Sequence, residues 1–84
     1  MNGAAKLYAI SDNAQMLAGL ALAGIPSQAA HTPDELSRAL EIIPSDIGIV
    51  IVTSGLAAKS ADVLEKHREK ELLPMLTVVP EPGG

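Results

Sequence analysis

Three short apolar runs mark the strands expected in this chain. The central run, residues 46–53 (DIGIVIVT), is rich in β-branched side chains and lacks the polar–apolar alternation of half-exposed strands. This pattern predicts a strand covered by helices on both faces, as in a parallel sheet. Residues 6–11 (KLYAIS) and 75–79 (MLTVV) are shorter runs of the same kind, separated from the central run by enough chain for helices.

The segments between these runs carry helix signals. A first helix is expected over residues 14–23, where Gly24 supplies a left-handed stop. The sequence TPDE at 32–35 starts a second helix with a threonine cap, a proline in the first turn and a glutamate three residues after the cap. A third helix is expected over 54–67, and residues 27–30 supply a short edge strand.

These elements follow the order β-α-β-α-β-α-β along 84 residues. The predicted fold class is α/β, a small Rossmann-like or flavodoxin-like three-layer fold. It has a four-stranded parallel sheet with helices on both faces and right-handed crossovers. One domain is expected over residues 1–84, of which 79–84 form a proline- and glycine-rich end. Folds of this kind host many unrelated activities, so the fold alone defines no function.

Composition argues against several kinds of function. The chain has no cysteine, which removes disulfides, thiolate chemistry and zinc–thiolate sites. A net charge of −4 argues against binding to nucleic acid or to an anionic membrane surface. No apolar stretch reaches the roughly 20 residues of a membrane-spanning helix, and residues 1–5 do not resemble a signal peptide. A soluble cytoplasmic domain is expected.

No group of residues points to catalysis, a cofactor or a metal. Asp12 follows the first strand, at the carboxyl ends of the strands, where open α/β folds bind ligands. Phospho-receiver domains carry a phosphate-accepting aspartate after the third strand, where this chain has Thr53. His31 and His67 are far apart in sequence and have no neighbouring ligands. Asp12 is expected to be a turn or cap residue. A receiver-like or small-ligand-binding module is the alternative.

The first predicted helix has an unusual surface. Between Asn13 and Ile25 there is no charged residue, whereas a helix that covers one face of a sheet normally has a polar outer side. Either small side chains simply face solvent, or this surface meets another protein. We favour the second interpretation. The candidate partner surface consists of Met16, Leu17, Gly19, Leu20 and Ala21.

Four segments resemble the F subunit of V-type and A-type ATP synthases. GLALAGI at 19–25 is similar to the family's G-F-R-L-A-G-[IV], and TPDE at 32–35 to its T-P-E-E helix start. DIGIVIVT at 46–53 is similar to its D-[IV]-G-I-I-I-[IV]-T strand, and LPMLTVVP at 73–80 to L-P-L-I-L-E-I-P. The segments occur in the family's order. Leu20 and Ala21 stand where the family has phenylalanine and arginine, so the contacts of those side chains are lost.

The resemblance implies a non-catalytic central-stalk (rotor) subunit of a V/A-type proton- or sodium-translocating ATPase. Such a subunit binds the coiled-coil D subunit and helps to couple ATP synthesis or hydrolysis to ion transport. It lies in the cytoplasm, peripheral to the membrane, and uses no cofactor, metal or nucleic acid. Family members usually continue into a C-terminal helix that docks along the rotor shaft, whereas this sequence stops at Gly84. A regulatory role is therefore not expected. Self-association of the isolated chain through the first helix is a further alternative.

Overall fold

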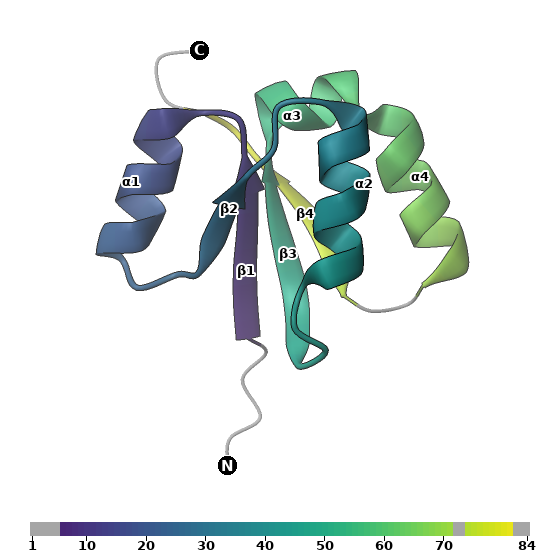
Figure 1. Ribbon diagram of the computed structural model, residues 1–84, viewed down its shortest axis with the longest axis horizontal. Helices are drawn as coiled ribbons and strands as arrows, with labels where there is room; N and C mark the ends of the chain where they lie inside the picture. Colours follow the sequence, from purple (N-terminus) through teal and green to yellow (C-terminus); the bar gives the residue numbers. More distant parts are fainter. Residues whose placement is uncertain (1–5, 72–73, 82–84) are drawn as a thin grey trace.

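The computed structural model describes residues 6–71 and 74–81. A four-stranded sheet runs through the molecule, with strand order β2-β1-β3-β4 and all neighbours parallel (Figure 1). The elements in chain order are β1 (Lys6–Ser11), α1 (Ala14–Leu22), β2 (Ser27–Ala29), α2 (Pro33–Ile42), β3 (Ile47–Thr53), α3 (Ser54–Lys59), α4 (Ala61–Lys70) and β4 (Met75–Val79). The predicted α/β architecture, a parallel sheet with helices on both faces, is confirmed.

Most predicted boundaries agree with the observed ones, and the main difference concerns the third helix. Gly24 follows α1 with a φ of 80°, the left-handed conformation predicted for it. The helix predicted over 54–67 is instead two helices, because Ser60 adopts φ −123° and ψ 26° between α3 and α4. This break lets α3 lie at the carboxyl end of β3 while α4 runs back along the sheet (Figure 1). The proline- and glycine-rich end extends into residues 82–84, which lie outside the described residues.

The main core lies between the sheet and the layer formed by α2, α3 and α4. Val50 and Val52 of β3 are fully buried in it, as are Leu36 of α2 and Leu56 of α3. A side chain of this size stabilises the fold by about 1.5–3 kcal/mol when it is fully buried rather than exposed. Ile10 of β1 completes the sheet side of the core. This face therefore carries most of the hydrophobic stabilisation.

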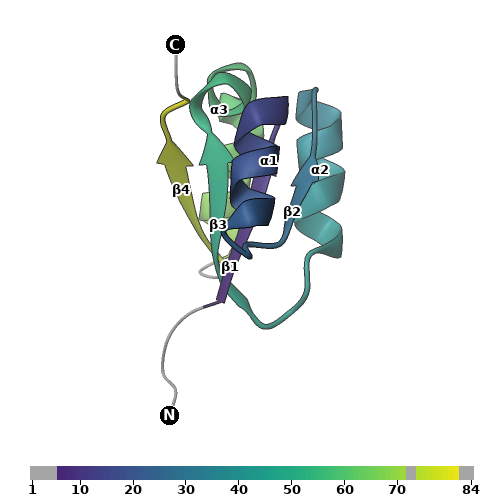
Figure 2. The ribbon, with the colours of Figure 1, turned by 90° about the vertical axis from the view of Figure 1, so that its left-hand side faces the viewer.

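The opposite face of the sheet is covered only in part. α1 packs on β1 and β2, where Ala9 is fully buried. In Figure 2, β3 and β4 stand beside α1 with no helix in front of them. Ile49 and Ile51 point to this side, because side chains alternate along β3, and both are only half-buried. The prediction of a central strand covered on both faces is therefore wrong for the α1 side, where no helix within residues 6–71 and 74–81 lies above β3.

Candidate functional site

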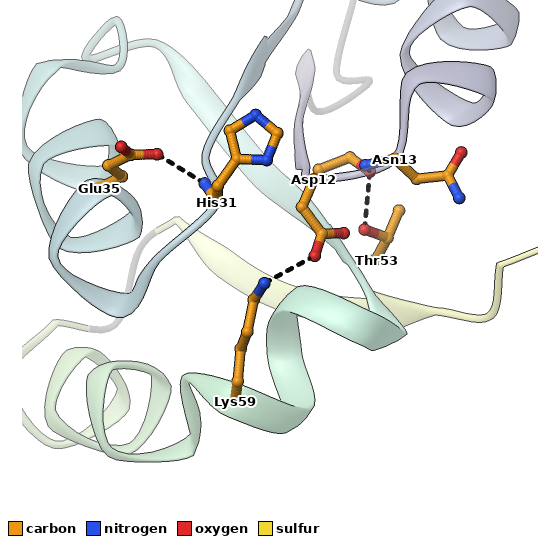
Figure 3. A network of polar contacts seen from close by, with 7 residues as sticks. Asp12, Asn13, His31, Glu35, Thr53 and Lys59 are labelled. Carbon is orange, nitrogen blue, oxygen red and sulfur yellow. Dashed lines mark hydrogen bonds and ion pairs between the residues drawn. The ribbon is translucent and has the colours of Figure 1, made fainter.

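The carboxyl ends of β1 and β3 form the sheet edge at which open α/β folds bind ligands. The connection after β1 leads to β2 on one side, and the connection after β3 leads to β4 on the other. Ligands bind where two neighbouring strands diverge in this way. Figure 3 shows that polar side chains gather at this edge, with Asp12 and Asn13 after β1 and Thr53 at the end of β3.

A buried pair of hydroxyl groups joins the two strand ends. Thr53 Oγ1 donates to Ser11 Oγ over 2.8 Å, and neither residue is exposed to solvent. The same Ser11 oxygen accepts the backbone N–H of Asn13 at 2.9 Å. Asn13 Oδ1 in turn accepts the N–H of Met16 at 2.9 Å and caps α1. Thr53 thus holds two strands together, at the position where a receiver domain carries its aspartate.

Asp12 is paired with a lysine of the same chain. Lys59 Nζ, on α3, lies 3.0 Å from Asp12 Oδ2 (Figure 3). The hydrogen bond from Lys59 holds the pKa of Asp12 below its ordinary value, although partial burial of the carboxyl group acts in the opposite direction. Glu81 reaches this edge from beyond β4, since a Cβ added to Gly55 would lie 2.7 Å from Glu81 Oε1. The Lys59 ammonium therefore supplies the positive charge that a bound cation would bring to Asp12.

The Asp12–Lys59 pair should contribute to stability only above acidic pH. Because the folded-state pKa of Asp12 is lowered, the contribution is complete above its ordinary value of 3.8 and is lost as the pH falls through the lowered pKa. Lys59 is 45% exposed, so screening limits the effect of Lys59→Met to about 0.5–1 kcal/mol at neutral pH. Urea unfolding across the acid range should show this difference vanish at low pH. The matched control, Lys66→Met on α4, should show no such pH dependence.

Both histidines take part in structural hydrogen bonds, His31 through its backbone and His67 through its ring. The backbone N–H of His31 donates to Glu35 Oε1 at 2.6 Å, while Thr32 Oγ1 accepts the N–H of Glu35 at 3.1 Å. The predicted Thr32 cap thus forms, but Glu35 accepts from His31 and does not close the reciprocal capping box on the N–H of Thr32. His67 Nε2 lies 3.1 Å from the carbonyl oxygen of Pro74 and joins α4 to the start of β4. Within residues 6–71 and 74–81, no group of three or more metal-ligating side chains converges.

The five residues of the candidate partner surface do not share one side of α1. Met16, Leu17 and Leu20 are half-buried and face the chain's own sheet, while Gly19 and Ala21 are exposed. A Cβ added to Gly19 would meet nothing within 4 Å, so close packing inside the chain does not explain this glycine. The side directly opposite the sheet carries three exposed residues that sequence reasoning did not select: Gln15, Ala18 and Leu22. Helical periodicity could have found them, because they lie about half a turn from the residues that face the sheet.

The sheet order and this edge define a flavodoxin-like α/β domain whose own side chains pair at the usual ligand position. The sequence profile of one protein family, described as the ATP synthase (F/14-kDa) subunit, matches residues 7–84. The chain belongs to this family and is a non-catalytic subunit of an ATP synthase.

Two solved structures share the fold. The F subunit of the V-type ATP synthase from Archaeoglobus fulgidus is 23% identical, with a TM-score of 0.67 over 92% of this chain and 99% of that one. A response regulator receiver protein from Pseudomonas putida is 22% identical, with a TM-score of 0.63 over 94% of this chain and 70% of that one. No curated protein matches the chain in sequence. Among the described helices, none has the length and apolar character needed to cross a membrane.

Proposed function

We propose that this chain is a central-stalk subunit that binds the coiled-coil D subunit of a V/A-type ATPase and turns with it. In this role it would help to couple ATP synthesis or hydrolysis to proton or sodium transport, on the cytoplasmic side and peripheral to the membrane. Family membership supports a place in the complex. At the sheet edge Asp12 pairs with Lys59, and Thr53 bonds to Ser11, which supports a role in assembly rather than in ligand chemistry.

The observation that carries this proposal is the chargeless exposed side of α1. Residues 14–22 contain no Asp, Glu, Lys or Arg, and no residue of α1 is fully buried in the chain itself. The exposed sides of the other long helices are charged, for example at Glu41 on α2 and at Asp62 and Lys66 on α4. An uncharged helix surface is favourable when it is buried against a partner, because no charge then has to leave water. The resemblance to the F subunit implies the D subunit as this partner.

Ala21→Glu should weaken binding to the D subunit by about tenfold or more, because a carboxylate would be buried without a partner. The measurement is isothermal titration of the purified chain with the D subunit. Ala21 is exposed, so the variant should remain folded. Leu20→Glu is a poorer test, since Leu20 is half-buried against the sheet and its replacement also disturbs the packing of α1.

The matched control is Ala61→Glu, which places the same charge on an exposed alanine of α4, across the sheet from α1 (Figure 1). It should bind the D subunit like the wild type. Equal affinities for the wild type and Ala21→Glu would contradict docking through α1. A rise in Tm with Mg²⁺ or acetyl phosphate would favour a receiver-like or ligand-binding module instead.

A further inference from the structure

Two exposed apolar surfaces lie side by side on the α1 face of the sheet. The first is the outer side of α1, opposite the chain's own sheet, where Leu22 is 91% exposed. The second lies over β3, β4 and the start of β1, where Met75 is 59% exposed and Leu7 36%. We call this second surface the open strip. It is formed by Leu7, Ile49, Ile51, Met75 and Thr77.

The open strip has the dimensions of one helix like α1. It is chiefly two strands wide, about 10 Å, which is close to the diameter of a helix with its side chains. The five residues of β4 extend for about 17 Å, and the nine residues of α1 for about 13 Å. α1 itself occupies the neighbouring half of the same face, over β1 and β2 (Figure 2). A second helix of the same kind would complete the layer.

Charge selects which helix of this chain could fill the strip. None of the five strip residues is charged, so a helix that packs there must present an uncharged side. α2 and α4 present charged exposed sides, with Asp34, Arg38 and Glu41 on α2 and Glu65 and Lys66 on α4. Among the described helices of at least two turns, α1 alone has an uncharged exposed side. In the described part of the chain, each copy therefore carries both a strip that no helix covers and the helix that suits it.

We propose that the free chain forms a two-fold dimer in which α1 of each copy packs into the open strip of the other. A two-fold axis parallel to the strands, between the two α1 helices, gives this arrangement. This axis places α1 of one copy over the open strip of the other. The two sheets then enclose a single layer of two helices. The contact is isologous, as a two-fold interface requires, because the same two surfaces meet twice.

The dimer would bury three of the five large hydrophobic side chains that are exposed among the described residues. Leu22 on α1 and Met75 and Leu7 on the open strip would all become shielded from water. Stable interfaces bury about 800 Å² per partner, and each copy contributes two apolar surfaces and one flank of α1 toward such an area. A helix without charge around its whole circumference is typical of burial on all sides, which the single chain does not give to α1. This inference stands independently of the stalk role. Because both use the outer side of α1, the D subunit and a second copy would compete for it.

The test is sedimentation equilibrium of the purified chain alone, at concentrations up to about 100 µM. The chain has a mass of 8.7 kDa, and the proposal expects twice that mass. Ala18→Glu, on the outer side of α1, and Thr77→Lys, on the open strip, should each give monomers, because each places a charge in both copies of the contact. Ile42→Glu is the matched control. Ile42 is 70% exposed on α2, outside both surfaces, and this variant should remain a dimer.

Mixing the two monomeric variants gives a sharper result. A mixed dimer has one unaltered contact and one in which the glutamate of Ala18→Glu meets the strip that carries the lysine of Thr77→Lys. Association should therefore return only in the mixture. A monomeric wild type at these concentrations would overturn the proposal, as would a dimer that neither Ala18→Glu nor Thr77→Lys weakens. Far-UV circular dichroism confirms that each variant is folded. Since no D subunit is present, failure here leaves the stalk proposal unaffected.

Discussion

Val52→Lys should unfold the domain, whereas the same substitution at the preceding position, Ile51→Lys, should leave it folded. Val52 is fully buried beneath the layer of α2, α3 and α4, so an ammonium group there has neither water nor a partner. The expected cost is more than about 4 kcal/mol, which approaches the total stability of about 4–12 kcal/mol of a domain of this size. Ile51 is half-buried on the α1 side, where a lysine can extend its charged end into water.

Circular dichroism and thermal melting of the two variants measure this difference. Ile51→Lys should retain the far-UV spectrum and a cooperative transition, at a cost of about 1–2 kcal/mol. Unfolding of both variants would contradict the open α1 side, because it would show that β3 is covered equally on both faces. The comparison thus tests the feature on which the fold departs most from the pattern of its sequence.

Leu36→Ala should cost about 2–5 kcal/mol, while Ile42→Ala on the same helix should cost less than about 0.5 kcal/mol. Leu36 is fully buried in the core, and its truncation leaves a cavity between α2 and the sheet. Ile42 is 70% exposed at the end of α2 and loses few contacts. Urea unfolding measures both values. The domain has no phenylalanine or tryptophan, so its core depends on a few aliphatic side chains of this kind. Similar costs for the two variants would contradict the assigned core.

The sheet could be predicted from the sequence because its signals are local. The β-branched run at 46–53 marks the central strand, and the TPDE segment at 32–35 marks the start of α2. Gly24 marks the end of α1 through a conformation that glycine adopts readily. The break at Ser60 has only a weak local signal, since serine favours caps and turns but also occurs inside helices, and the change of direction depends on tertiary packing.

The sequence pattern also could not predict how much of the α1 face of the sheet is covered. An unbroken apolar run predicts burial on both faces of β3, but it does not show whether the chain itself supplies a helix for each face. Ile49 and Ile51 belong to the apolar run that predicts burial, yet both are only half-buried. At the candidate site, the absence of charge drew attention to α1. The five selected residues do not share one side of the helix, because Leu20 is half-buried against the sheet while Ala21 is exposed. Lys59 was not selected, since only the fold brings it to Asp12.

The most direct test of the stalk proposal is co-purification of this 84-residue chain with the D subunit, with the stoichiometry measured by light scattering. The proposal predicts a stable complex with one copy of each chain, which Ala21→Glu weakens and Ala61→Glu does not. A D subunit that elutes alone in the presence of excess folded chain would contradict it.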